Sequence, residues 1–494
     1  MKRHGAKRHG IKRLGAKRYG RRGRAAGAVA AATVLALLSS ACTGGGDGDG
    51  GPAAAGEAGT PGEIVIASGR DVTGKGGIRQ QLIRAWNKKQ EKAKTGYSAR
   101  LVELPGSADQ QRSQLLGALQ SGSAEYDVVN LDVTWVPEFA SAGLVRRLDG
   151  KLLDDDVIPS VAETARWKGE VYSAPFNSDV GLLYYRRDYL KKARVNDTDL
   201  GDTVRSWKDL KSLILTLDAG KAMPRSYEKG WTAQLAPYEG RTVSAIEAFA
   251  SAGDGAGLVD GEGRYTADRE QLEAGIAELR DRVDGAYTLD DAARSYEADS
   301  LRDFANGRTA FLRHWPYAYR TLHQSLTPEQ LGVAPLPGKA VLGGQNLAVA
   351  RTSQHAKAAT DLVTFLTGKE SERCLLEAGF AATRASVYTE PEPACGAART
   401  PGDDPGSGSG SGSGSGEGAD RIPRDAEGRP AYAARTLVPA LRDAVQRPRT
   451  PLYGAFTQTF SARLERLFSG KPVSGERLAD SLDAALREAL PGGG

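Results

Sequence analysis

Short apolar runs alternate with amphipathic segments along the chain after residue 62. Glu63–Ala67, Ala99–Leu104 and Tyr126–Asp132 have the composition of buried strands. Apolar residues at helical spacing predict one helix in each of the two intervals, with Ile78, Leu82, Ala85 and Trp86 on the face of the first and Leu115, Leu116 and Leu119 on the second. The order β-α-β-α-β predicts a largely parallel sheet covered by helices, in an α/β protein.

Polar residues follow two of these predicted strands. Ser68 and Arg70 come after the first strand, and Asp132 ends the third. Ligand-facing loops of such sheets lie at the carboxyl ends of the strands, so we expect these residues near a binding cleft. Because an Asp directly before a helix is also a common helix cap, capping is the alternative role for Asp132.

Residues 167–190 have the pattern of a chain that leaves one core and enters another. Gly169–Tyr172 predicts a turn entering a strand, Pro175 fixes the backbone, and Val180–Tyr185 is too apolar for a solvated hairpin. The polar triplet Asn177-Ser178-Asp179 separates these two runs. This pattern indicates an interdomain hinge lined by ligand contacts, with an ordinary hairpin as the alternative.

The rest of the chain adds further helices and one low-complexity segment. Helices are predicted over Trp207–Leu217, Val243–Ser251, Leu272–Val283 and Ala356–Leu366, and three more after Ala433. One of the last three has Phe456, Phe460, Leu464 and Leu467 on a single face. Residues 406–416 alternate Gly and Ser and have nothing to bury, so they predict a flexible loop.

The N-terminus differs from the remainder in composition. Residues 2–20 repeat Lys-Arg pairs, an apolar run from Ala25 to Leu38 follows, and small residues precede Cys42. This is the pattern of a secretory signal peptide over residues 1–41, with an apolar run too short for a comfortable transmembrane helix. The Gly-, Ala- and Asp-rich residues 42–62 predict a flexible tether. Nucleic-acid binding is the alternative use of the basic repeat.

Charge and composition fit an exported globular protein without a nucleic-acid partner. The 494 residues leave room for two or three cores, and 40% of them are hydrophobic. Residues 1–41 hold eleven Lys and Arg and no acid, so their removal leaves 55 basic side chains against 61 acidic ones. A mildly acidic mature chain has no basic excess with which to recruit a polyanion.

Cysteine and histidine usage points to a disulfide and away from metal chemistry. Beyond Cys42 the chain has only Cys374 and Cys395, which could close one disulfide in an oxidising compartment or remain two unrelated buried thiols. The histidines that survive processing, His314, His323 and His355, lack ligand spacing. With no nucleophile elbow and no phosphate-binding loop either, we expect no metal, no cofactor and no enzymatic activity.

Several of these segments resemble one known family. Residues 167–190 and Tyr126–Asp149 are similar to two signatures of the extracellular solute-binding proteins of bacterial ABC importers, carbohydrate class. Leu312–Tyr319 resembles a Trp-Pro-Tyr loop of that family, with His314 in place of Asn, and Val341–Val349 resembles its return crossing. Leu38-Ser-Ser-Ala-Cys42 resembles a bacterial lipobox, which implies lipidation of Cys42 and anchoring to the membrane surface.

The resemblance implies a periplasmic-binding-protein-like (type II) fold of two lobes joined by hinge strands. The expected first lobe comprises residues 63–176 and 341–386, and the second 177–340 and 387–491. The expected ligand-binding residues face the cleft between the lobes. They are Ser68, Arg70, Asp132, Asn177, Asp179, Trp231, Tyr238, Glu239, Trp315, Tyr317, Gly343, Gly344, Gln345 and Arg384. Aromatic faces stack on sugar rings and carboxylates accept from hydroxyls, although each Trp is equally suited to a core.

The resemblance also implies a function. The expected protein is a monomeric lipoprotein at the extracellular face of the membrane that captures a trehalose- or maltose-like di- or oligosaccharide and delivers it to ABC permease subunits. A secreted carbohydrate hydrolase is the alternative, and it would need two carboxylates about 5 to 10 Å apart on a rigid frame. Asp132, Asp179 and Glu239 could supply such a pair, but no enzyme signature surrounds them.

Overall fold

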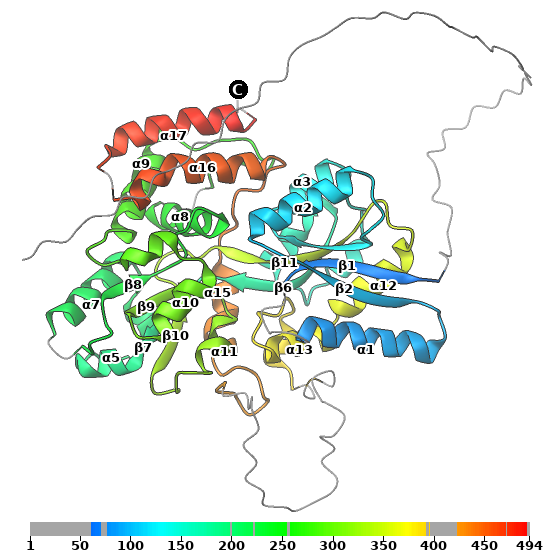
Figure 1. The fold of residues 1–494 in the computed structure, drawn as a ribbon, viewed down its shortest axis with the longest axis horizontal. Coiled ribbons are helices and arrows are strands. Elements are labelled where there is room, and N and C mark those ends of the chain that lie inside the picture. Colours follow the sequence, from blue (N-terminus) through cyan, green and yellow to red (C-terminus); the bar gives the residue numbers. More distant parts are fainter. Residues whose placement is uncertain are drawn as a thin grey trace, which may run out of the picture. The chain divides into compact units, whose positions relative to one another are not determined.

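The computed structural model describes residues 61–70, 77–197, 200–220, 223–253, 257–391, 395, 422–470 and 472–491. The predicted signal peptide, Cys42, nearly all of the predicted tether and the Gly/Ser-rich segment 406–416 lie outside these residues. Two main sheets carry the fold, one in each lobe (Figure 1).

The first lobe is built on a five-stranded sheet of mixed direction. Its order is β2 (Ser98–Leu104), β1 (Glu63–Gly69), β3 (Val128–Asp132), β11 (Leu342–Val349) and β6 (Ala174–Val180). β1 is parallel to β2 and β3, as the β-α-β-α-β order predicts, whereas β11 is antiparallel to β3 and β6. The sheet is therefore less parallel than expected, because a strand from far along the chain returns to complete it.

Four main helices pack in the first lobe. They are α1 (Ile78–Ala93), α2 (Ala108–Gln120), α12 (Ala356–Leu366) and α13 (Lys369–Glu377). Ser107 and Gln110 form a capping box at the start of α2, which satisfies backbone amides that the helix itself cannot pair. Trp86 of α1 is 2% exposed and packs in the core of this lobe.

The second lobe is built on a four-stranded sheet. Its order is β10 (Leu331–Pro335), β7 (Leu182–Arg186), β9 (Thr309–His314) and β8 (Lys229–Thr232). β7 is antiparallel to both neighbours and β8 is parallel to β9. The main helices of this lobe are α7 (Trp207–Ala219), α8 (Glu239–Ala252), α9 (Arg269–Arg282), α10 (Glu297–Ala305) and α11 (Ala318–Leu322).

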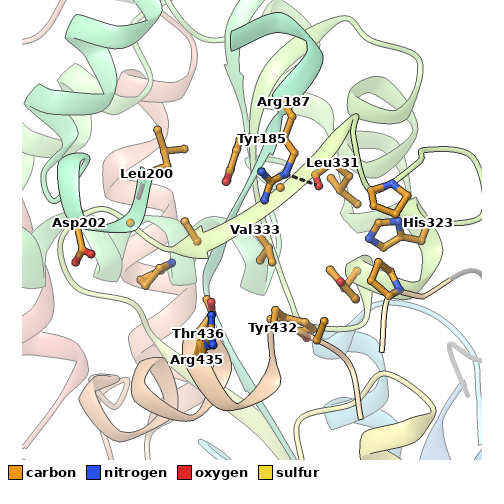
Figure 2. A pocket seen from close by; sticks show the side chains of 18 residues that line it. Tyr185, Arg187, Leu200, Asp202, His323, Leu331, Val333, Tyr432, Arg435 and Thr436 are labelled. Carbon is orange, nitrogen blue, oxygen red and sulfur yellow. Dashed lines mark hydrogen bonds between the residues drawn. The ribbon is translucent and has the colours of Figure 1, made fainter. Parts of the chain in front are cut away.

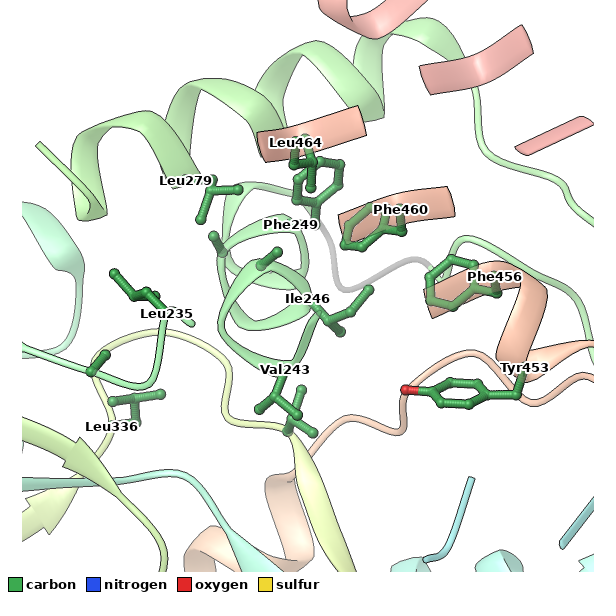
Figure 3. Packing of buried hydrophobic residues seen from close by; sticks show 14 of the residues in the cluster. Leu235, Val243, Ile246, Phe249, Leu279, Leu336, Tyr453, Phe456, Phe460 and Leu464 are labelled. Carbon is green, nitrogen blue, oxygen red and sulfur yellow. The ribbon is translucent and has the colours of Figure 1, made fainter. Parts of the chain in front are cut away.

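Two C-terminal helices complete the core of the second lobe. α16 (Tyr453–Phe468) and α17 (Gly475–Ala489) lie beside α8 and α9 (Figure 1). The face predicted from Phe456, Phe460 and Leu464 is buried, and the rings of Phe249 and Phe460 meet edge to face at 5.2 Å (Figure 3). Burying each aromatic side chain contributes about 2 kcal/mol, so these helices belong to the lobe rather than to a separate appendage.

The chain crosses between the lobes at adjacent places. β6 runs through Gly181 into β7, β10 leads into β11, and Val445 forms a parallel bridge to Val341 just before β11. Val445 lies in the segment that connects α15 (Val438–Asp443) to α16, residues 444–452. A Cβ on Gly181 would lie 2.3 Å from the Glu247 carboxylate, so only glycine fits this crossing.

Shorter elements connect the main ones. They are α3 (Val136–Ser141), α4 (Pro159–Ala162), β4 (Arg166–Trp167), β5 (Glu170–Val171), α5 (Arg187–Lys192), α6 (Leu200–Thr203), α14 (Ser386–Thr389) and a π-helical turn (Ala433–Leu437). Cys374 and Cys395 form a disulfide. In the described part of the chain, no helix has both the length and the hydropathy needed to cross a bilayer.

Candidate functional site

A polar network covers the strand ends of the first lobe. The Arg79 guanidinium donates to Ser68 Oγ at 2.9 Å, to Asn177 Oδ1 at 3.3 Å and to Gln345 Oε1 at 2.6 Å. Asn130 Nδ2 donates to the same Ser68 and Gln345 oxygens, each at 2.8 Å. The predicted site residues Ser68, Asn177 and Gln345 lie on β1, β6 and β11. Two residues that were not predicted, Arg79 of α1 and Asn130 of β3, hold them together.

One guanidinium joins the two lobes. Arg447 lies in the segment that connects α15 to α16, and its side chain is 1% exposed. Its Nη2 lies 2.8 Å from Asp132 Oδ1 at the end of β3, and its Nη1 lies 2.6 Å from Glu239 Oε1 at the start of α8. Asp132 also accepts from the Thr134 amide and hydroxyl, but it does not cap the following helix, α3, which begins after Trp135 without a side-chain cap.

The start of α8 is held from both lobes. The Glu239 carboxylate accepts from the Tyr453 hydroxyl and, at 3.0 Å, from the Thr457 hydroxyl, both on α16. The Glu239 backbone amide donates to Asp109 Oδ2 of the first lobe at 3.1 Å, where the positive end of the helix dipole favours a carboxylate. Burial raises the pKa of Glu239 to about 7, although Arg447 opposes the shift.

Asp179 lies where β6 leaves the first lobe, and its Oδ1 atom is buried without a hydrogen-bond partner in the described structure. Burial raises its pKa to about 7, against the attraction of Arg79, Arg313 and Arg447. A Cβ on Gly343 would lie 3.2 Å from Asp179 Cβ and 3.1 Å from the Trp315 ring. Three predicted residues therefore meet at the hinge.

The backbone conformation at position 344, rather than contact with a ligand, requires glycine there. It lies within β11 rather than ahead of it, at φ +119°, and a Cβ there would lie 2.5 Å from the Asn177 carbonyl oxygen. Only glycine adopts this backbone conformation without strain. The close pairing of β11 with β6 depends on it.

Aromatic side chains of the second lobe gather beside a buried ion pair. Arg313 binds the Glu247 carboxylate, with its Nη2 at 2.6 Å from Oε1, and its guanidinium carbon lies 3.8 Å from the centre of the Trp315 ring. Burial raises the pKa of the Tyr317 hydroxyl, and the nearby Arg313 guanidinium opposes this shift only in part. Tyr238 precedes α8 and packs against Tyr296 with ring centres 4.6 Å apart.

His314 positions the loop that carries Trp315 and Tyr317. It is fully buried, its Nδ1 accepts from the Trp315 amide at 2.9 Å, and its Nε2 lies 3.2 Å from the Glu297 carbonyl oxygen. Burial lowers its pKa to about 3, so the ring is neutral and Nε2 is the donor. The histidine found in place of the family's asparagine thus bonds to the backbone on both sides.

Three predicted site residues lie apart from this cluster. Trp231 is 5% exposed and meets Trp207 edge to face at 5.2 Å in the core of the second lobe. Arg384 pairs with Asp154 at 2.8 Å and with Asp156 at 3.5 Å in the first lobe. Arg70 is exposed at the end of β1.

A separate cavity of about 560 Å³ lies on the second lobe (Figure 2). Its walls come from β7, β10, α11 and the π-helical turn, with Tyr185, Tyr432 and Arg435 among the lining residues. Arg187 crosses it to donate to the Leu331 carbonyl oxygen at 3.1 Å. None of the residues predicted to bind ligand lines this cavity.

The described residues contain no cluster of His, Cys, Asp or Glu able to hold a metal ion. The chemistry available at the lobe junction is that of carboxylates, guanidiniums, amides and aromatic faces. These groups bind and orient polar ligands with apolar ring faces.

Comparison with known proteins identifies the family. Residues 73–373 match the bacterial extracellular solute-binding proteins. The chain belongs to this family. A probable ABC transporter-binding protein of Deinococcus radiodurans is 30% identical over 319 residues, which are 62% of this chain and 72% of that protein. As a member of this family, the chain is the solute-binding component of an ABC transporter.

Solved structures of solute-binding proteins share the fold. Maltose-bound MalE3 of T. maritima superimposes with a TM-score of 0.69 at 21% identity, covering 87% of this chain and all of that one. The GacH receptor of Streptomyces glaucescens, solved unliganded and with acarbose, gives 0.66 at 22% identity, covering 87% and 99%. The expected two-lobed fold and the expected family are both confirmed.

Proposed function

We propose that this solute-binding protein captures a di- or oligosaccharide of the trehalose or maltose type outside the cell and hands it to its permease. The observation that carries the proposal is the junction of the lobes. There, Asp132 of the first lobe and Glu239 of the second share Arg447, and the Trp315 ring lies beside Gly343 of β11. Carboxylates able to accept from sugar hydroxyls and rings able to stack on sugar faces are thus contributed by both lobes.

Because the site is divided between the lobes, ligand binding can favour one arrangement of the lobes over another. A ligand that contacts both lobes stabilises the closed arrangement by its differential affinity for that arrangement, and a permease can then recognise the closed shape. We further propose that the protein acts as a monomer, attached to the extracellular face of the membrane by lipid on Cys42. Replacement of Cys42 by Ser should release the protein into the medium and abolish metabolic labelling with a fatty acid.

The substrate class is tested by binding and by recovery of the ligand. The purified protein is screened by thermal shift against trehalose, maltose, longer maltodextrins, cellobiose and chitobiose. A sugar at a hundred times its Kd should add about 2.7 kcal/mol to the free energy of unfolding. Recovery of the bound sugar unchanged supports a receptor, whereas its cleavage would favour a hydrolase. The absence of any shift would refute binding of the sugars proposed here.

A further inference from the structure

The cavity of about 560 Å³ on the second lobe lies along the edge of a sheet (Figure 2). β10 is the last strand of the four-stranded sheet, and every residue of this strand, Leu331–Pro335, lines the cavity. An edge strand presents backbone N–H and C=O groups that can pair with another extended chain. One wall of the cavity is therefore made of main chain.

Hydrogen bonds around β10 show which of its backbone groups face outward. The Arg187 amide donates to the Gln330 carbonyl oxygen at 2.9 Å, whereas the Leu331 amide turns away from β7 and donates to an earlier carbonyl oxygen at 3.0 Å. Pairs of residues in an antiparallel ladder alternate between bonded and non-bonded, and this ladder runs without a register shift. The N–H and C=O groups of Val333 therefore point away from β7, to the outer edge.

The open part of this edge is one residue long. The Leu331 carbonyl oxygen already accepts from Arg187 Nε at 3.1 Å. Pro335 has no N–H to donate, and a Cβ on Gly201 of α6 would lie 2.9 Å from its ring. Val333 thus offers one donor and one acceptor side by side, which match the C=O and N–H groups of a single peptide residue.

The charged side chains that line the cavity leave one positive charge in excess. Arg187 pairs with Asp197 at 2.6 Å, and Asp202 pairs with Arg205 at 3.4 Å. Arg435 comes from the π-helical turn and forms no ion pair with any described residue. Because guanidiniums form strong, bidentate hydrogen bonds with carboxylates, a ligand with one carboxylate matches this balance.

Another wall of the cavity holds the loop that carries Trp315 and Tyr317. The Tyr432 hydroxyl donates to the carbonyl oxygen of Pro316, between these two residues, at 3.3 Å. The Tyr432 ring also lies against the Tyr319 ring of α11, with ring centres 4.3 Å apart. Both tyrosines line the cavity (Figure 2). A ligand that fixes these rings therefore also restrains the loop.

We propose that this cavity binds a short extended peptide through its backbone and its C-terminal carboxylate, and that an occupied cavity strengthens sugar binding in the cleft. One peptide residue pairs with Val333 by two hydrogen bonds, as an added strand does, and the carboxylate binds Arg435. The tyrosine rings cover apolar atoms of the peptide. Restraint of Tyr432 leaves less loop motion for a sugar to restrict when it binds. The peptide site goes beyond the proposed function, and only its effect on sugar affinity rests on that function.

N-acetylated tripeptides test the site by titration calorimetry of the purified protein without sugar. Their sequence is Ala-Xaa-Ala, with Ala, Leu, Tyr or Ser in the middle. At least one should bind with a Kd below about 1 mM and at least tenfold more tightly than the same peptide ending in an amide. Methylation of one backbone nitrogen, tried at each position in turn, should abolish binding at the residue that pairs with Val333.

Two variants locate the peptide, and a third serves as the control. Arg435→Gln should reduce the preference for the carboxylate over the amide to threefold or less. Its melting temperature should stay that of the parent protein, because Arg435 has no ion pair within the described residues. Arg442→Gln changes an exposed arginine on α15 that does not line the cavity, and it should leave the preference unchanged.

The effect on the cleft is measured with the sugar that the thermal-shift screen identifies. Saturating peptide should tighten sugar binding at least threefold, and saturating sugar should tighten peptide binding by the same factor. Tyr432→Phe removes the hydrogen bond to Pro316, so peptide at a concentration that saturates this variant should change sugar affinity less than 1.5-fold.

The outcomes separate the peptide site from the sugar-binding function. Equal affinities for acid and amide, or absence of binding by every tripeptide, would overturn the proposal. Acetate that binds as tightly as the peptide would show an unspecific anion site, and displacement of the peptide by sugar would place it in the cleft; either result also overturns it. If a tripeptide binds as expected but no sugar does, the sugar-binding function fails and the peptide site stands.

Discussion

Replacement of Arg447 by Met should open the cleft of the ligand-free protein. The variant keeps most of the side-chain volume and removes the guanidinium that Asp132 and Glu239 share from opposite lobes. Glu239 is 8% exposed and Asp132 is 19% exposed at their side chains, so both lose a counter-charge where water reaches them poorly. Removal of one partner from a buried ion pair typically costs about 3 to 5 kcal/mol.

The protein can relieve most of this cost by separating the lobes, because both carboxylates then regain water. A penalty of about 3 kcal/mol corresponds to a shift of more than a hundredfold in the ratio of closed to open protein. Small-angle X-ray scattering without ligand should therefore show a larger radius of gyration for the variant at pH 8. The melting temperature should fall less than for a core substitution.

The effect should depend on pH in a defined direction. Burial already raises the pKa of Glu239 to about 7, and loss of the cation raises it further. At pH 5 the variant's Glu239 is protonated and needs no partner, so the difference from the parent protein should shrink. Equal radii of gyration for variant and parent at pH 8 would refute the reasoning. A double variant with Glu239→Gln should recover part of the closed population.

Three further predictions concern other parts of the structure. Trp231→Ala should lower the free energy of unfolding by about 3 to 5 kcal/mol in a urea titration, whereas Trp315→Ala should weaken ligand binding with a much smaller loss; equal effects would contradict these placements. Gly344→Ala should destabilise by more than 1 kcal/mol, because its φ of +119° and a backbone oxygen 2.5 Å from the new Cβ both oppose it, while Gly150→Ala, with no atom within 4 Å, should change the melting temperature little. The pKa of the Asp179 carboxyl is about 7 in the folded protein against an ordinary 3.8, so the free energy of unfolding should fall as pH rises from 4 to 7. Asp179→Asn should flatten this dependence of the melting temperature on pH in differential scanning fluorimetry. An unchanged slope would contradict the burial of the Asp179 carboxyl as the cause.

Local patterns were sufficient for the parts of the fold that depend on neighbouring residues. The β-α-β-α-β order and the buried face of α16 both follow from periodicities within a few positions. The direction of β11 does not, because its partners β3 and β6 lie more than a hundred residues earlier. Pairing over that distance is set by packing of the whole lobe rather than by local preference.

The site was predictable only in part, because some of its contacts also join residues that are far apart in the sequence. Asp132 and Asp179 lie at the ends of strands and Glu239 begins a helix, which are positions where sequence alone suggests a ligand contact. Arg447 was missed because it lies 315 residues from Asp132 in a segment with no motif of its own. Trp231 was assigned to the cleft, but its ring packs against Trp207, a contact that composition cannot distinguish from sugar stacking.

The hydrogen bond between Thr457 and Glu239 spans 218 residues of chain, and this separation bears on how the protein is made. α8 is synthesised long before α16 and α17, which cover its apolar face, so a growing chain cannot complete the second lobe until those helices have emerged. Until then, Phe249 and its neighbours remain exposed to water. A chain that stays incomplete for most of its synthesis keeps this lobe unfolded until α16 and α17 have emerged. It is also dependent on chaperones that hold exposed apolar segments apart, so truncation ahead of α16 should yield aggregates rather than a smaller folded protein.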